Sequence, residues 1–146
     1  MNGDPATGVT GGDTLTSGEA LHAESIVVNG LAQPGHLPKA FDAMIAGGIT
    51  ATNLTVAANE GSIEGTRRVE QALAALEAHR SSDRLRVVTT GEEIRRAKND
   101  GVNGVIIGFQ NADPIEDDLT FLSVFYRLGL RILQLTYQRR NLLVDG

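Results

Sequence analysis

Hydrophobic residues recur in two alternating patterns from about Ser25 onward. β-branched and apolar runs typical of strands begin near Ser25, Ile49, Leu85, Gly104 and Leu130. Between these runs, apolar residues repeat at helical spacing over residues 38–46, 62–79, 90–100 and 117–128. Strands that alternate with helices through short loops are parallel, with right-handed crossovers. The pattern therefore predicts an α/β fold, and it fits either a small doubly wound sheet or part of a β/α barrel.

Local signals mark where several of these elements begin and end. Thr90 and Glu93 have the spacing of a capping box, which starts a helix. Gly47 and Gly48 close the first of these helices, because glycine adopts the left-handed conformation without a steric penalty. Asn29-Gly30 is a turn signal and is expected to end the first strand. The run from Gly104 to Phe109 is apolar throughout, as in a strand buried on both faces.

The chain divides into a tail and one structured region. Residues 1–20 are rich in Gly, Thr, Asp and Ser, so we expect a disordered tail there. Residues 21–146 are expected to form a partial β/α barrel, because a closed eight-stranded barrel takes about 250 residues. We expect the N-terminal half of a TIM-type (β/α)8 barrel, in which the strands that begin near Ser25, Ile49, Gly104 and Leu130 are parallel neighbours in chain order, with the helices on one side. The partner expected for this chain is then the missing C-terminal half of the barrel.

Composition excludes several function classes. The chain has 13 basic and 18 acidic residues and a formal net charge of −5, which argues against a nucleic-acid partner. It contains no cysteine, so it has neither a disulfide framework nor a thiolate metal site. No apolar stretch approaches the roughly 20 residues of a membrane span, and no secretory signal is present. We therefore expect a soluble, cytoplasmic protein without a membrane partner.

Five blocks carry a resemblance to a known family, and their order and spacing agree together. The blocks are Asn29-Gly30-Leu31-Ala32-Gln33, Gly47-Gly48-Ile49, Gly108-Phe109-Gln110-Asn111, Leu122 to Thr136 (LSVFYRLGLRILQLT) and Thr136 to Asn141 (TYQRRN). From about Ser25 to Gly146 the sequence resembles the zinc dipeptidase family of the membrane, or renal, dipeptidase type. The resemblance implies a β/α-barrel amidohydrolase that hydrolyses dipeptides or similar small amides.

The same resemblance implies two zinc ions, but the matching ligand positions have changed here. In the family a His and an Asp follow the first strand, and a Glu in the third block bridges both metals. Two cations held by a bridging carboxylate share a hydroxide and lower its pKa. This sequence has Leu31, Gln33 and Gln110 at those positions. An alkyl group and two neutral amides are poor ligands for a divalent cation, so no metal cofactor is expected for this chain.

Other polar residues are weaker candidates for a site. Arg139, Arg140 and Asn141 follow the last strand, on the active face of a barrel, and are candidates for binding a substrate carboxylate. They are equally compatible with solvated loop residues. His36 follows the first strand and can substitute for a lost ligand, although an exposed loop histidine is the simpler interpretation. The acidic residues from Asp113 to Asp118 are typical of a helix N-terminus.

Three hypotheses about function follow. The first is a dipeptidase-like hydrolase that acts on small peptides or related amides. The second is a non-catalytic barrel relative that binds or senses a small molecule after losing its metals. The third is an independent small α/β domain whose resemblance to the family is superficial. The lost ligand positions leave the question of enzymatic activity open.

Overall fold

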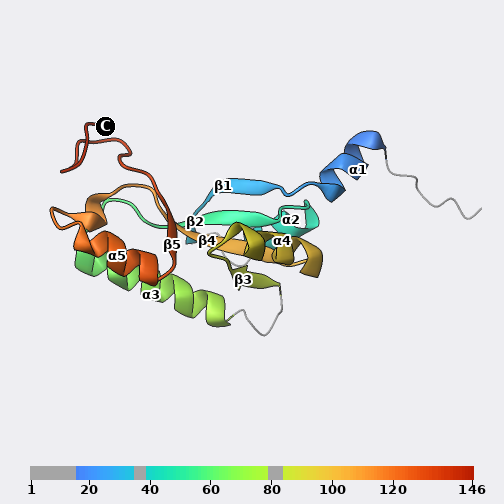
Figure 1. Cartoon of the computed structure of the whole chain (residues 1–146), viewed down its shortest axis with the longest axis horizontal. Coiled ribbons are helices and arrows are strands. Elements are labelled where there is room, and N and C mark those ends of the chain that lie inside the picture. Colours follow the sequence, from blue (N-terminus) through green and yellow to red (C-terminus); the bar gives the residue numbers. More distant parts are fainter. Residues whose placement is uncertain (1–15, 35–38, 79–83) are drawn as a thin grey trace, which may run out of the picture.

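The computed structural model describes residues 16–34, 39–78 and 84–146. They form helices that alternate with the strands of one sheet (Figure 1). The helices are α1 (Ser17–Glu24), α2 (Lys39–Ala46), α3 (Ser62–Ala78), α4 (Gly91–Asp100), the short 3-10 helix η3 (Asp113–Ile115) and α5 (Thr120–Arg127). The strands are β1 (Val28–Ala32), β2 (Ala51–Ala57), β3 (Leu85–Val87), β4 (Asn103–Phe109) and β5 (Leu130–Leu133).

All strand pairs in the sheet are parallel, which confirms the predicted α/β class. β1 pairs with β2, β2 with β4, and β4 with β5, so these strands are neighbours in chain order, as expected. β3 is the exception, because β2 pairs directly with β4 and not with β3. Only three residues long, β3 lies outside the β1-β2-β4-β5 series.

β3 and β5 divide β4 between them. β3 pairs with the amino half of β4, where Val87 is the partner of Val105. β5 pairs with the carboxyl half, beginning with Leu130 opposite Ile107. Since β2 pairs along β4 from Gly104 to Phe109, β3 and β5 occupy its other edge in succession. The carboxyl ends of β1, β2, β4 and β5 therefore lie along one rim of the sheet.

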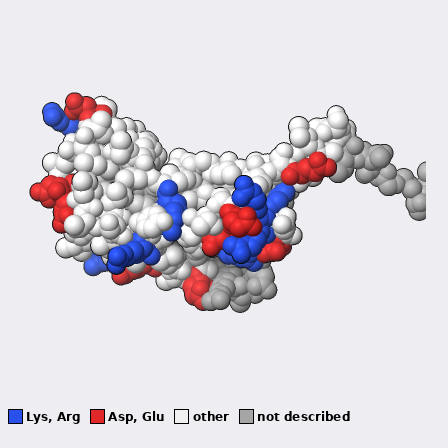
Figure 2. Space-filling model, in the orientation of Figure 1, with Lys and Arg blue, Asp and Glu red and all other residues white. Residues whose placement is uncertain are grey.

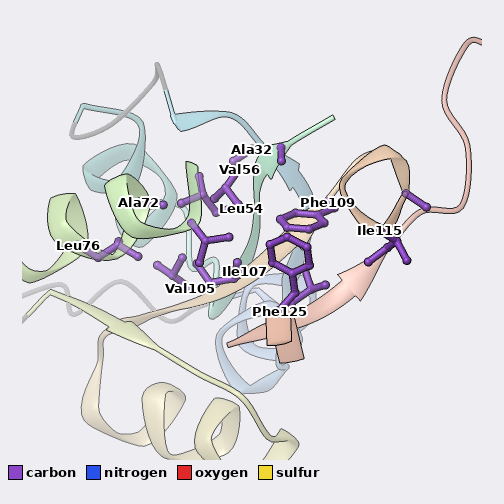
Figure 3. Packing of buried hydrophobic residues seen from close by; sticks show 14 of the residues in the cluster. Ala32, Leu54, Val56, Ala72, Leu76, Val105, Ile107, Phe109, Ile115 and Phe125 are labelled. Carbon is purple, nitrogen blue, oxygen red and sulfur yellow. The ribbon is translucent and has the colours of Figure 1, made fainter. Parts of the chain in front are cut away.

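The main hydrophobic core lies between one face of the sheet and α2, α3 and α5. Alternate residues of a strand point to opposite faces, and Val105, Ile107 and Phe109 of β4 all point into this core (Figure 3). Phe109 meets Phe125 of α5 edge to face, with ring centroids 4.9 Å apart and planes at 76°. This is a preferred aromatic geometry, and both rings are buried.

A smaller core on the opposite face corrects the expectation that all helices lie on one side. Ala51 and Ile106 of the sheet pack there against Val88 and against Ala97 of α4. A methyl group at Gly104 would lie 3.1 Å from Val88, so this glycine lets the segment after β3 approach the sheet closely. α4 therefore covers the amino half of the face opposite α2, α3 and α5.

The first helix was not predicted. α1 occupies Ser17–Glu24, where a tail was expected up to residue 20, while residues 1–15 lie outside the described part. Its start is fixed by a capping box, in which Thr16 accepts a hydrogen bond from Glu19 N and Glu19 accepts one from Thr16 N. None of its residues is buried, and its sequence, SGEALHAE, has no apolar stripe from which a helix could be predicted.

The first strand is displaced from its predicted place. The run from Ser25 to Val28 was expected to be the strand and Asn29-Gly30 its end, but β1 begins at Val28 and passes through both residues. The pairing with β2 shifts register between Asn29 and Ala32, as at a bulge. The side chain of Asn29 accepts a hydrogen bond from Leu31 N at 3.2 Å, so the local Asn-Gly chemistry is used within the strand.

Charged side chains of both signs are interspersed on the face shown in Figure 2. Arg86 pairs with Asp100 at 2.6 Å, and Arg84 pairs with Asp42 at 2.8 Å. These exposed pairs contribute little to stability. The face in Figure 2 shows no large region of a single sign. Among the helices that the structure describes, none is both long enough and apolar enough to cross a bilayer.

Candidate ligand site at the carboxyl ends of the strands

Polar loop residues gather where the parallel strands end. In open or closed parallel sheets, ligands bind at the carboxyl ends of the strands, because the exit loops meet there. Here the loops after β2, β4 and β5 are joined by the side chains of Asn59, Asn111 and Asn141. Asn111 Nδ2 donates to Asn59 Oδ1 at 3.1 Å, and Asn141 Nδ2 donates to Asn111 Oδ1 at 2.6 Å. We call these three residues the asparagine relay.

Asn141, one of the predicted substrate-binding residues, organises its own loop. Its Oδ1 accepts hydrogen bonds from Leu143 N at 2.9 Å and Val144 N at 3.0 Å. Its Nδ2 donates to Leu135 O at 2.6 Å, in addition to Asn111. The side chain is therefore fully engaged within the protein.

The other two predicted substrate-binding residues differ in their surroundings. Arg139 Nη2 lies 3.1 Å from Asp113 Oδ2 and 3.4 Å from Asn59 O, so it bridges the exit loops of β2, β4 and β5. Arg140 pairs with the exposed Asp145 at 3.1 Å, and its side chain is 82% exposed in the described part of the chain. Of the two guanidinium groups, that of Arg140 is the more accessible to a ligand.

A cavity of about 570 Å³ opens at the ends of β1, β2 and β4 and is bounded by α3. Gln33 and Gln110, two of the three positions that match the family's metal ligands, both line it. Leu31, the third, is 47% exposed and is not among the described residues that line the cavity. Arg68 and Gln71 of α3 contribute further polar groups to the wall. The cavity thus combines neutral carboxamides with one cation, Arg68, and one anion, Glu60.

A buried asparagine on β2 fixes the approach of β1 to this edge. Asn53 is 6% exposed, and its Nδ2 donates to Gly30 O at 2.9 Å, beside the irregularity of β1. The carboxamide lies over Gly108 of β4, in the space that a side chain there would occupy. Asn53 Oδ1 has no hydrogen-bond partner in the described part of the chain. Gly108 is thus required by packing.

A carboxylate from the loop after β4 caps the helix after β2. Glu116 Oε1 accepts a hydrogen bond from Ser62 N at 2.7 Å, at the first turn of α3. Hydrogen bonds from the backbone and side chain of Ser62 lower the pKa of Glu116. Glu116 has a φ of 53°, an uncommon value for a residue other than glycine. The acidic stretch therefore ties two exit loops together.

The donor groups at the expected ligand positions do not fit a pair of zinc ions. Leu31 offers no lone pair, and Gln33 and Gln110 offer only neutral amide oxygens. Within residues 16–34, 39–78 and 84–146, no group of three or more His, Cys, Asp or Glu side chains is arranged to hold a metal ion. His22 instead forms a hydrogen bond of 2.9 Å with Gly47 O. His36 and His79 lie outside the described residues.

The relay residues Asn59 and Asn111 were not identified as a pair from the sequence. Their contact spans 52 positions, and Asn111 to Asn141 spans another 30. No spacing motif links residues so far apart. The available signal was their shared position, directly after strands that end at the same rim.

Comparison with known proteins shows which family the chain is similar to. The model of the membrane dipeptidase family, peptidase family M19, matches residues 24–146. No curated protein gives a significant match.

Three solved structures are similar. An amidohydrolase from Pseudomonas aeruginosa is 35% identical, with a TM-score of 0.81, over 87% of this chain and 38% of its own. The dipeptidase AC, a metallopeptidase of family M19, is 20% identical, with a TM-score of 0.64, over 78% of this chain and 43% of its own. A metallopeptidase from Rhodobacter sphaeroides, liganded with a phosphinate mimic of the dipeptide L-Ala-D-Ala, is 18% identical, with a TM-score of 0.65, over 79% and 46%. The chain thus spans less than half the length of each of these proteins.

Proposed function

Because the chain belongs to peptidase family M19, the membrane dipeptidase family, we propose that it contributes the first strands of a β/α-barrel hydrolase that acts on dipeptides or similar small amides. The observation that carries the proposal is the cavity at the carboxyl ends of the strands, lined by Gln33 and Gln110. This cavity opens at the carboxyl ends of the strands, the end at which barrel enzymes bind their substrates, and α3 forms one wall of it.

The chemistry of the cavity suits a peptide group. Each glutamine carboxamide offers two N–H donors and one carbonyl acceptor, which complement the C=O and N–H of an amide bond. Arg68, on the α3 wall of the cavity, can pair with a ligand carboxylate. Arg68 lies 3.2 Å from Glu64 and 3.9 Å from Glu60. A ligand carboxylate must therefore compete with these two side chains.

The proposed hydrolase does not use the family's carboxylate and imidazole ligands at Leu31, Gln33 and Gln110. These residues can orient an amide and exclude water from it, but they do not supply a general base, because neither a carboxamide nor an alkyl group takes up a proton near neutral pH. A catalytic base must therefore be a residue other than these three, and Glu60 is a carboxylate that lines the same cavity.

A second function is favoured by the same donor set. A barrel whose ligand positions bear neutral side chains can bind a small peptide-like molecule without hydrolysing it. The replacement of all three matching positions, Leu31, Gln33 and Gln110, favours this alternative. The two functions differ in turnover and share the binding site.

The protein that contains this chain, incubated with L-alanyl-D-alanine, separates the two functions. Release of alanine supports the hydrolase, and calorimetric binding without release supports the binding protein. Gln110→Ala is expected to weaken either signal about 10-fold, the effect of one or two lost hydrogen bonds. Gln138→Ala, at an exposed position of the loop after β5, is the matched control. If the unaltered protein neither binds nor hydrolyses the dipeptide, both functions are refuted.

A further inference from the structure

The centre of the asparagine relay is a fully buried side chain. Asn111 is 0% exposed, and it uses both ends of its carboxamide, Nδ2 toward Asn59 and Oδ1 toward Asn141. A buried carboxamide with both ends paired is geometrically restrained, because rotation would leave polar atoms without partners. Asn111 therefore joins the loop after β4 to the loops after β2 and β5.

A second connection runs beside the relay but is weaker. Arg139 reaches Asp113 and Asn59 O from the surface, with a side chain that is 62% exposed. Exposed ion pairs contribute between zero and about 1 kcal/mol. The two hydrogen bonds of Asn111 are partly buried and are therefore screened less by solvent, so Asn111 makes the stronger connection between the loops.

The relay also determines the position of the ligand-facing residue next to it. Gln110 N donates to Ala57 O at 2.9 Å, which extends the β2–β4 pairing by one residue beyond β4. The following residue, Asn111, is held by its side chain. The backbone of Gln110 is thus fixed on both sides, while its side chain lines the cavity.

We propose that Asn111 is a positioning residue, which holds Gln110 in the cavity and couples the ligand site to the loop after β5. Asn141 transmits the coupling, because the side chain that bonds Asn111 also holds Leu143 N and Val144 N. Occupation of the cavity beside Gln110 then orders the segment at Leu143 and Val144. The coupling to ligand rests on the proposed function, whereas the mechanical connection does not.

Amide hydrogen exchange tests the mechanical connection without any ligand. Asn111→Ala is expected to speed exchange at Leu143 N and Val144 N by roughly 2- to 12-fold, the loss of one buried hydrogen bond. Asn103→Ala is the matched control, because Asn103 is equally buried and donates to Ile49 O at 3.0 Å, but at the amino end of β4, the strand that Asn111 follows. Equal acceleration in both variants, or none in Asn111→Ala, overturns the connection.

The coupling to ligand is measured with L-alanyl-D-alanine as the probe. In the unaltered protein the dipeptide is expected to slow exchange at Leu143 N and Val144 N. In Asn59→Ala, which keeps the bond between Asn111 and Asn141, the dipeptide should still slow exchange there; in Asn111→Ala it should not. If Asn111→Ala retains the full ligand effect, the positioning role is wrong. If the unaltered protein fails to bind the dipeptide, the proposed ligand is wrong, and the exchange rates without ligand still decide the mechanical connection.

Discussion

Substitution of Gly108 by alanine is expected to destabilise the protein through a single neighbour, Asn53. The added methyl carbon would overlap Asn53 Oδ1 and would lie 3.0 Å from Asn53 Cγ and 3.3 Å from Nδ2. Backbone and strand neighbours hold both residues, so the carboxamide must rotate away. That rotation breaks the 2.9 Å hydrogen bond from Asn53 Nδ2 to Gly30 O.

The size of the effect follows from three contributions. Loss of the hydrogen bond costs about 1 kcal/mol, and overpacking of a filled site costs about 1–3 kcal/mol. Replacing a glycine within a strand returns roughly 0.5–1 kcal/mol of backbone entropy. The net destabilisation is about 1–3 kcal/mol, which lowers the melting temperature by roughly 2–4 °C per kcal/mol for a chain of this size.

Urea unfolding followed by circular dichroism measures this change, with two comparisons. Gly30→Ala is the control, because nothing lies within 4 Å of the added carbon and Gly30 O remains available to Asn53; it should change stability by less than about 0.5 kcal/mol. In an Asn53→Ala background the methyl group has room, so Gly108→Ala should cost little. If Gly108→Ala costs the same with and without Asn53, the reasoning is refuted.

Three further predictions concern other contacts. Glu116→Gln should lower stability at neutral pH by weakening the hydrogen bond from Ser62 N. The folded protein lowers the pKa of Glu116 below its ordinary 4.5, so the stability difference between the two proteins is full above that pH and disappears as the pH falls through the folded-state pKa. Unfolding curves measured over a series of pH values test this. Arg131→Lys should lower the free energy of unfolding in urea by about 1–2 kcal/mol, since lysine cannot reproduce both the hydrogen bond to Thr89 O at 2.9 Å and the stacking on the Tyr126 ring. Arg95→Lys, on the exposed side of α4, is the control and should be neutral. The family's donor types are restored by Leu31→His, Gln33→Asp and Gln110→Glu together. In the protein that contains this chain, these changes should raise the zinc content measured by elemental analysis, and an unchanged zinc content contradicts the assigned ligand positions.

The element types were largely predictable because local patterns agree with the fold. Thr90 and Glu93 form the expected capping box, and Gly101 ends α4 with a φ of 67°. The limits of β1 were not predictable, because Asn29-Gly30 has the chemistry of a turn. Tertiary contacts, namely the pairing with β2 and the hydrogen bond from Asn53, keep this segment extended. Strand order presents a similar case, since no local pattern shows that β3 lies beside the amino half of β4.

The candidate site was predictable as a location but not as a network. The family resemblance placed Gln33 and Gln110 at the carboxyl edge, and both line one cavity there. Arg139 and Asn141 were candidates for binding a substrate, yet in the described part of the chain both make hydrogen bonds to other protein groups. Whether a side chain points to a ligand or to a neighbouring loop depends on distances across the sheet. Sequence spacing does not contain those distances.

β3 and β5 share one edge of β4, and the loops that follow them are constrained in different ways. β3 ends opposite Val105, so the loop from β3 to α4 stays below the rim on which the other exit loops meet. Arg131 Nε, bonded to Thr89 O, connects that loop to β5. The β3–α4 segment is therefore constrained by its own packing, because Val88 is buried and Thr90 caps α4. The loops that follow β2, β4 and β5 are constrained jointly, because a change in any one of them is felt by the other two.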